Sequence, residues 1–211
     1  MFKYLPNILT FFRILLVPFF AWFFFSDKFS YQLLSLVIFI VASITDFLDG
    51  RIARKYNIES NLGKFLDPLA DKFLVLTAYF CFVSIPDYHI PIWIILIIVL
   101  REFILTGLRL LAESEGKKLV TSSHGKWKTA TQMFTIIVIL VMMLFKTFMI
   151  EHGYVKYSKF VSGEKFWSYF VGNFWGLLVS YIPLILIIFA AGITVYSGIM
   201  YIITNKDLFK K

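Results

Sequence analysis

The chain has 211 residues, of which 59% are hydrophobic and only 16% are charged, and its mean hydropathy is +0.79. A surface that faces water needs more polar side chains than this, so the composition excludes a soluble globular protein and predicts an integral membrane protein. The net charge of +8 does not indicate nucleic-acid binding. Lys and Arg crowd the ends of apolar runs, where they suit contacts with anionic membrane lipids.

Apolar runs of about 20 residues are long enough to cross a hydrocarbon core of roughly 30 Å as helices. The sequence contains about six such runs, near residues 9–25, 31–49, 68–85, 91–111, 130–150 and 174–203. Pro18 is expected to kink the first run, and Pro68 to occupy the first turn of the third. The pattern predicts an all-α membrane protein whose single transmembrane domain covers residues 1–211.

Basic residues orient these spans. If the stretch Thr45–Asp71 lies in the cytoplasm, 16 of the 21 Lys and Arg residues are on its side of the membrane and 5 are on the other. Because positive residues are enriched on the cytoplasmic side, we expect both termini and this stretch to face the cytoplasm from the inner membrane. The segment 151–173 then lies outside, where its aromatic residues would form an interfacial belt.

The stretch Thr45–Asp71 concentrates acidic residues in an otherwise apolar sequence. Two carboxylates and two small residues occupy helical positions i, i+3, i+4 and i+7, namely Asp46, Asp49, Gly50 and Ala53. Asp67 and Asp71 repeat the spacing i, i+4 on the next predicted helix. Residues at these spacings share one helix face, so a short loop between the two helices would bring four carboxylates together at the membrane surface.

Four adjacent carboxylates cannot all stay ionised unless cations neutralise them. An all-oxygen ligand set favours hard divalent ions such as Mg²⁺, Mn²⁺ or Ca²⁺, and a pair of such ions can clamp a transferring phosphoryl group. Alternatively, the aspartates cap helices and pair with neighbouring basic residues in a solvated loop. The two helical spacings beside small residues favour the metal site.

The full spacing is Asp46-x2-Asp49-Gly50-x2-Ala53-Arg54-x8-Gly63-x3-Asp67-x3-Asp71. It resembles the signature of the CDP-alcohol phosphatidyltransferases. This resemblance implies a six-helix, commonly dimeric membrane domain, and therefore a homodimer. It also implies that the four aspartates hold two Mg²⁺ or Mn²⁺ ions on the diphosphate of a CDP-linked lipid. Asp71, beside Asp67, would be the catalytic base, and the nucleotide would be lined by Gly50, Ala53, Arg54 and Gly63.

Near the N-terminus, Asn7 and Thr10 resemble a family element close to the nucleotide, although a helix cap and an interfacial anchor explain them almost as well. Further stretches resemble the bacterial phosphatidylglycerophosphate synthases in particular, namely LPNILTFFRILLVP, FLDPLADK, REFILTGLR and HGKWKTATQM. The resemblance implies transfer of the phosphatidyl group from CDP-diacylglycerol to sn-glycerol 3-phosphate, which gives phosphatidylglycerophosphate and CMP.

The basic residues of the fourth span and the following loop are compatible with that acceptor. Arg101 and Arg109 are eight residues apart, on nearly one helix face, where an unpaired cation would be costly in a membrane. Lys126 and Lys128 follow in the next loop. A cationic pocket beside the metal site suits an acceptor that carries a phosphate, because Arg binds phosphate oxygens bidentately.

Other interpretations stay open. Arg101 could instead pair with Glu102 or Asp71, while the loop lysines serve only topology. The acceptor could be phosphatidylglycerol, as in cardiolipin synthesis, or serine or an inositol phosphate. A divalent-cation transporter would need acids through the membrane depth, whereas these cluster at one end. Small residues on the last span offer a face for helix packing or a dimer contact, namely Ala191, Thr194 and Gly198.

Overall fold

The computed structural model describes the backbone of residues 5–56, 61–114, 124–152 and 166–205, and the side chains of a smaller set, 11–45, 72–109, 111–112, 127–152, 178 and 180–205. Within these ranges the chain is helical and contains no strand. The elements are α1 (Leu5–Phe24), α2 (Phe29–Tyr56), α3 (Asn61–Val83), the 3₁₀ helix η2 (Pro86–Tyr88), α4 (Ile92–Ser114), α5 (His124–Glu151) and α6 (Phe166–Thr204). The prediction of an all-α protein with six long helices is confirmed.

Each predicted span lies within or largely overlaps one helix, but the helices around the acidic stretch extend beyond the spans. Helix α2 ends at Tyr56 and α3 begins at Asn61. Pro68 therefore lies inside α3, and the prediction that it occupies the first turn was wrong. The apolar run beginning at Pro68 indicates where the bundle becomes apolar, whereas the helix already forms over the preceding polar residues. Helix α1 runs through Pro18 without a break.

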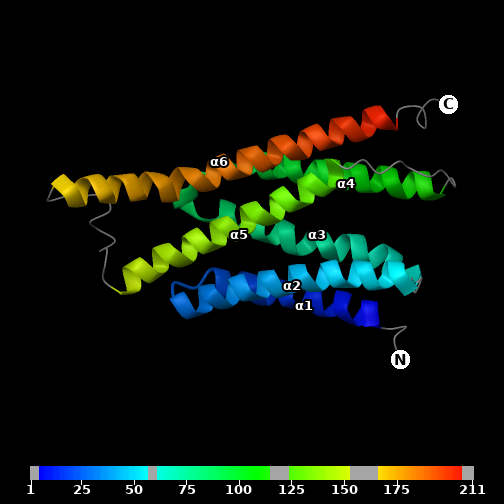
Figure 1. The fold of residues 1–211 in the computed structure, drawn as a ribbon, viewed down its shortest axis with the longest axis horizontal. Coiled ribbons are helices and arrows are strands. Elements are labelled where there is room, and N and C mark those ends of the chain that lie inside the picture. Colours follow the sequence, from blue (N-terminus) through cyan, green and yellow to red (C-terminus); the bar gives the residue numbers. More distant parts are fainter. Residues whose placement is uncertain (1–4, 57–60, 115–123, 153–165, 206–211) are drawn as a thin grey trace.

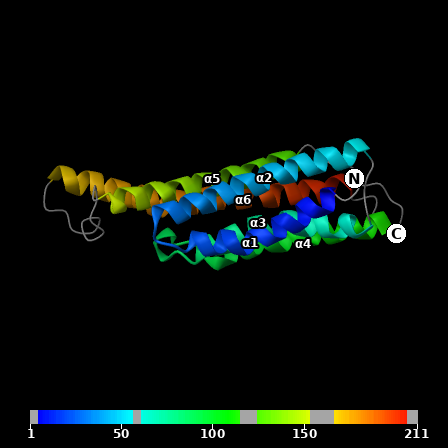
Figure 2. The same cartoon turned by 90° about the horizontal axis from the view of Figure 1, so that it is seen from below.

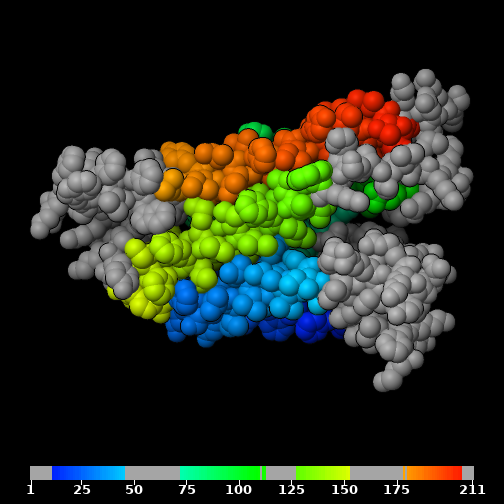
Figure 3. All heavy atoms as spheres, viewed as in Figure 1, coloured from blue at the N-terminus to red at the C-terminus, as the bar shows by residue number. Residues whose placement is uncertain are grey.

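The six helices form two layers that run along one common direction (Figures 1 and 2). One layer contains α2, α5 and α6, and the other contains α1, α3 and α4. Neighbours within a layer are in contact, and across the layers α1 packs on α2, α3 on α5 and α4 on α6. The helices α3, α4, α5 and α6 thus enclose a four-helix region on one side of the bundle. Figure 3 shows the outer face of the layer formed by α6, α5 and α2.

The bundle is apolar inside and outside. Its core contains the rings of Phe20, Phe39, Phe24 and Phe82, with centroids 6.0 Å apart for the first pair and 5.7 Å for the second. Large apolar side chains also point outward along the helices; Trp22, for example, is 79% exposed. A soluble monomer rarely exposes so much continuous apolar surface, whereas a lipid environment accommodates it.

Two described helical stretches are long and apolar enough to cross a membrane, Trp127–Glu151 and Ser180–Thr204. Shorter apolar stretches are found in α1, α2 and α3. Together with the outward apolar side chains, these helices support the prediction of a membrane protein. The six individual spans, the single domain over 1–211 and the direction of insertion stay predictions.

The N-terminal end of α1 and the C-terminal end of α6 lie at the same end of the bundle, where α2 ends and α3 begins (Figure 1). At the opposite end, the N-terminal backbone amide of α2 at Phe29 donates a hydrogen bond of 3.1 Å to Oε2 of Glu151. A carboxylate is favourable at a helix N-terminus because the helix dipole is positive there. Beside it, Lys146 of α5 forms an ion pair with Asp87 of η2. These contacts tie α2, α5 and η2 together at the end away from the termini.

Candidate active site

The signature residues divide between two helices. Asp46, Asp49, Gly50, Ala53 and Arg54 lie in the last turns of α2, and Gly63, Asp67 and Asp71 lie in the first turns of α3. Because both segments are helical, the spacings place the aspartates of each helix on a common face. Only residues 57–60 separate the two helices, so their ends are at most about 18 Å apart.

The side chains of these signature residues lie outside the described residues, as do those of Asn7 and Thr10 in the first turns of α1. The convergence of the four carboxylates and their contacts with a nucleotide therefore stay predictions. Among the described side chains, no group of three or more potential metal ligands occurs. The donor set that the signature would supply consists of carboxylates alone, which fits a hard divalent cation.

The described side chains form a charged cluster between α3, α4, α5 and α6, and one of its members, Lys72, follows the last signature aspartate in the chain. Its centre is Glu102 of α4, which is only 7% exposed. Three cations surround the carboxylate: Lys72 of α3, Arg101 of α4 and Lys128 of α5. We call these four residues the Glu102 cluster. A buried carboxylate is costly unless cations and hydrogen bonds compensate for the lost hydration, and here both are present.

Each cation of the Glu102 cluster is held in a specific way. Nη1 of Arg101 lies 3.2 Å from Oε1 of Glu102, and its Nη2 donates a hydrogen bond of 3.1 Å to Oγ of Ser197 on α6. The ammonium group of Lys128 forms an ion pair with the same Oε1 atom. The ammonium group of Lys72 is 3.8 Å from Oε2 and donates a hydrogen bond to the hydroxyl of Thr106. One carboxylate thus connects α3 and α5 with α4, and Arg101 extends the connection to α6.

Neighbouring residues support this arrangement. The hydroxyl of Thr106 donates a hydrogen bond of 2.7 Å to the backbone carbonyl of Glu102, one turn earlier on α4. Nε2 of Gln132 on α5 donates to Oγ1 of Thr194 on α6 at 3.2 Å, and both side chains are buried. Gly198 leaves room for the guanidinium, since a Cβ atom there would lie 3.1 Å from Nε of Arg101. That Nε atom is buried and has no hydrogen-bond partner.

A small cavity of about 30 Å³ lies beside the cluster, between α3, α4 and α5. Its polar lining comes from Lys72, Glu102, Lys128, Thr129 and Gln132. This volume accommodates a water molecule, which needs at least about 10 to 15 Å³, but not a substrate. Substrate binding at the cluster would therefore involve the adjoining surface toward the signature residues.

A larger cavity, of about 720 Å³, lies at the opposite end of the bundle. Its charged lining residues are Asp27, Lys28, Asp87, Lys146 and Glu151. They belong to the junction of α1 with α2, to η2 and to the C-terminal part of α5. This end of the bundle is remote from the signature residues, so the larger cavity is not the candidate active site.

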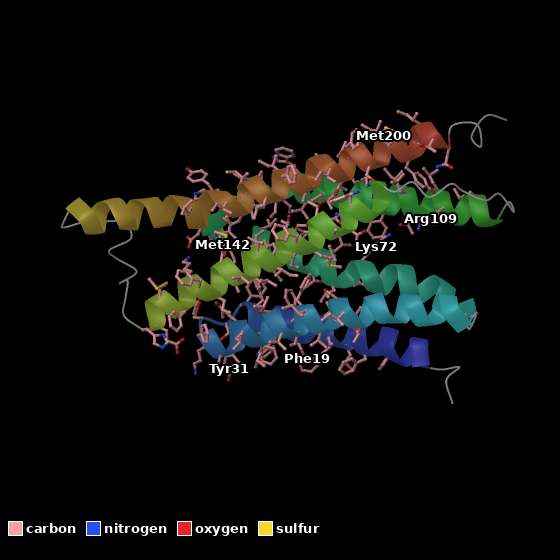
Figure 4. The ribbon with its side chains drawn as sticks, in the orientation of Figure 1. Phe19, Tyr31, Lys72, Arg109, Met142 and Met200 are labelled. Carbon is pink, nitrogen blue, oxygen red and sulfur yellow. The ribbon has the colours of Figure 1, made fainter. Side chains whose placement is uncertain are left out.

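The structure brings together two of the four residues predicted to bind the acceptor phosphate. Arg101 and Lys128 both contact Glu102, whereas Arg109 is exposed two turns further along α4. The side chain of Lys126 lies outside the described residues. In Figure 4, Lys72 and Arg109 lie in the half of the bundle that contains the termini, while Tyr31 and Met142 lie in the other half.

The pairing of Arg101 with Glu102, which the sequence left open, is present in the structure. Sequence reasoning did not identify Glu102 as the centre of a site, nor the contributions of Lys72, Thr106 and Ser197. An acidic residue in the middle of an apolar span was the available signal for Glu102, because such residues are rare there and usually have a partner. The contacts with Thr106 and Ser197 carried no comparable signal.

The small-residue face on α6 packs within the chain. Ala191 is buried. Thr194 is 0% exposed and accepts a hydrogen bond from Gln132 of α5. Gly198 contacts Arg101 of α4. Of the two uses that the sequence allowed for this face, helix packing is the one that the structure shows.

Comparison with known proteins identifies the family. The model of the CDP-alcohol phosphatidyltransferase family matches residues 3–158 of the chain. The chain belongs to this family. It is accordingly a membrane enzyme of the phosphatidyltransferase class, as the sequence resemblance implied, and a divalent-cation transporter is disfavoured. The family generally uses divalent cations, which agrees with the all-carboxylate donor set of the signature.

The curated relatives include three bacterial proteins named CDP-diacylglycerol–glycerol-3-phosphate 3-phosphatidyltransferase. The chain is 43% identical to that of Bacillus subtilis over 105 residues, 50% of this chain and 53% of the relative. It is 39% identical to that of Haemophilus influenzae over 137 residues, 63% of this chain and 72% of the relative. The protein of Rickettsia bellii is 38% identical over 138 residues, 65% of this chain and 75% of the relative. The alignment thus spans about half of the first relative and about three quarters of the others.

Proposed function

We propose that the enzyme transfers the phosphatidyl group from CDP-diacylglycerol to sn-glycerol 3-phosphate and releases phosphatidylglycerophosphate and CMP. The observation that best supports this acceptor is the Glu102 cluster, in which Lys72, the residue after the last signature aspartate, is brought together with Arg101 and Lys128. Cations beside the phosphoryl-transfer site favour an acceptor that itself carries a phosphate. The names of the similar bacterial proteins support the same acceptor.

In this proposal the four signature aspartates, Asp46, Asp49, Asp67 and Asp71, hold two Mg²⁺ or Mn²⁺ ions. When bound, the ions would neutralise the diphosphate of the donor and stabilise charge on the leaving CMP. The nucleotide would lie against Gly50, Ala53, Arg54 and Gly63, with Asn7 and Thr10 close to it. Small residues on the face that carries the aspartates would let the nucleotide approach the helix backbone.

The proposed reaction is a displacement at phosphorus. The 1-hydroxyl oxygen of glycerol 3-phosphate attacks the β-phosphorus of CDP-diacylglycerol and forms a new P–O bond. The bond between the β-phosphorus and the bridging oxygen breaks, and CMP leaves with its electron pair. Asp71 accepts the proton of the attacking hydroxyl. The phosphate of the acceptor would be bound by Arg101, Arg109, Lys126 and Lys128, which keeps its hydroxyl oriented toward the donor.

We further propose that the protein resides in the cytoplasmic membrane with both termini and the active site facing the cytoplasm. The asymmetry of 16 to 5 basic residues supports this orientation. A homodimer and a single catalytic domain over residues 1–211 complete the proposal. Labelling of single cysteines introduced near residue 3 and near residue 158 with a membrane-impermeant reagent in intact cells tests the orientation. We expect the cysteine near residue 158 alone to react. Reaction of the cysteine near residue 3 alone would indicate the opposite orientation in the membrane.

The acceptor is tested with a panel of alcohols and the purified protein. Glycerol 3-phosphate, phosphatidylglycerol, serine and an inositol phosphate are supplied separately with CDP-diacylglycerol and Mg²⁺, and the lipid products are identified by mass spectrometry. We expect phosphatidylglycerophosphate from glycerol 3-phosphate and no product from the other alcohols. A product from another member of the panel, with none from glycerol 3-phosphate, would assign a different acceptor within the family.

A further inference from the structure

Glu102 is the only buried acidic residue among the described side chains. It lies in the middle of α4, beside Arg101 and otherwise among apolar residues, and is almost completely buried. A carboxylate in such a position is expensive to retain, and an apolar residue would pack there without that cost. Its three cationic contacts come from three different helices, so the local sequence of α4 alone does not explain it.

The charges of the Glu102 cluster do not cancel. Lys72, Arg101 and Lys128 contribute three positive charges and Glu102 one negative charge, which leaves a net charge of +2 on these four side chains. A phosphate monoester carries a charge of about −1.5 to −2 near neutral pH. Two ammonium groups and one guanidinium carry more N–H donors than a single carboxylate can accept, and the hydroxyls of Thr106 and Ser197 accept two of the others.

The position of the cluster suits an acceptor phosphate. Lys72 follows Asp71 directly in the chain, and its ammonium group turns toward α4, where it meets Thr106 and Glu102. An anion bound by these cations would therefore lie at the level of the bundle where α3 carries the proposed base. Without a central carboxylate, three like charges in an apolar bundle would repel one another and move toward water.

We infer that Glu102 is a positioning residue that holds Lys72, Arg101 and Lys128 together as a doubly positive receptor for the phosphate group of the acceptor. This inference rests on the proposed function, because the phosphate that the three cations bind is that of the proposed acceptor, glycerol 3-phosphate. Glu102 does not touch the substrate. Its carboxylate fixes the three cations, and the cations bind the phosphate.

A positioning role differs from two simpler roles in its effect on the KM for glycerol 3-phosphate. If Glu102 only lowered the local charge, Glu102→Gln would raise the net charge to +3 and decrease this KM. If Glu102 only stabilised the fold, the substitution would lower the melting temperature and leave this KM unchanged. If Glu102 positions the cations, the substitution disperses them, and the KM for glycerol 3-phosphate rises while the KM for CDP-diacylglycerol does not.

The experiment uses the full-length protein in detergent micelles and compares Glu102→Gln with the wild type. We expect the KM for glycerol 3-phosphate to rise by at least about tenfold, as for the loss of one charge-assisted contact, and the KM for CDP-diacylglycerol to change by less than about twofold. Asp87→Asn is the matched control, since it breaks a carboxylate–lysine pair at the other end of the bundle, and both KM values should stay at the wild-type level. An unchanged or lower KM for glycerol 3-phosphate, or an equal rise in both KM values, would overturn the inference.

If Glu102→Gln does not fold, Glu102→Asp provides the same test, because it keeps the charge but shortens the side chain by one methylene group. Aspartate cannot reach the cations on α3 and α5 together, so we expect a rise of a few fold in the KM for glycerol 3-phosphate. A wild-type KM in a folded Glu102→Asp variant would overturn the inference.

Binding of inorganic phosphate separates this inference from the proposed function. We expect phosphate to raise the melting temperature of the wild type and not that of the Glu102 variant; equal shifts in both would contradict a positioning role. This measurement does not depend on turnover. A wild type that is stabilised by phosphate but does not use glycerol 3-phosphate would refute the proposed acceptor and leave the phosphate receptor in place.

Discussion

Substitution of Gly198 by alanine perturbs the Glu102 cluster without changing its charges. The new Cβ atom would lie 3.1 Å from Nε and 3.3 Å from Cγ of Arg101, so the arginine side chain must move by a few tenths of an ångström. Its two hydrogen bonds, to Glu102 and Ser197, already measure 3.2 Å and 3.1 Å. A displacement of that size takes at least one of them to about 3.5 Å or beyond, where a hydrogen bond is lost.

The cost of this displacement can be measured against Gly192 on the same helix. A Cβ atom at Gly192 meets nothing within 4 Å, so Gly192→Ala gains about 1 kcal/mol of helix propensity without a clash. Gly198→Ala gains the same propensity but loses about 1 to 3 kcal/mol through overpacking and the weakened hydrogen bond. The two variants should therefore differ by about 1 to 3 kcal/mol, or roughly 2 to 12 °C in melting temperature for a chain of this size.

Thermal unfolding in detergent, followed by intrinsic tryptophan fluorescence, measures this difference, and initial rates with glycerol 3-phosphate show whether the acceptor site is affected. We expect Gly198→Ala to melt below Gly192→Ala and to have the higher KM for glycerol 3-phosphate. Equal melting temperatures together with equal KM values would show that Arg101 is not held against Gly198, and would refute the described packing of α4 on α6.

Three further predictions concern the reaction. Asp71→Asn should abolish turnover and leave the melting temperature within a few degrees of the wild type, because it removes the proposed base and metal ligand but keeps the size of the side chain; near-normal formation of product would exclude Asp71 as the base. Removal of divalent cations with EDTA should abolish activity, and added Mg²⁺ or Mn²⁺ should restore it; full activity in EDTA would contradict a metal-dependent mechanism. Arg109→Ala should raise the KM for glycerol 3-phosphate less than Arg101→Ala does, since Arg109 is exposed whereas Arg101 is held by Glu102 and Ser197; the reverse order in steady-state kinetics would move the acceptor site toward the end of α4.

Features of the fold that depend on hydropathy and regular spacing could be predicted from the sequence. The apolar runs indicated six helices, and the spacing of the signature correctly placed its two halves on helical segments. The start of α3 could not be predicted from hydropathy, because the helix begins at Asn61, in a polar segment, and continues through Pro68. A change in hydropathy indicates where an apolar environment begins, and hydrogen bonding of the backbone decides where a helix begins.

The candidate site was predictable where one residue type carries the chemistry. The basic residues Arg101 and Lys128, which the structure brings together at Glu102, belong to that class, whereas the convergence of the four aspartates stays a prediction. The centre of the Glu102 cluster could not be predicted in this way, because Glu102 acquires its partners only when α3 and α5 pack against α4. The same holds for Gly198, whose importance comes from the arginine that lies against it. Contacts between helices distant in sequence depend on which helix faces meet, and composition does not specify this.

The most direct test of the proposed function is release of CMP by the purified protein when each substrate is omitted in turn. We expect CMP release to require both CDP-diacylglycerol and glycerol 3-phosphate, with one phosphatidylglycerophosphate formed per CMP. Release of CMP without an alcohol acceptor would indicate hydrolysis of the donor. The absence of phosphatidylglycerophosphate when both substrates and Mg²⁺ are present would contradict the proposed function.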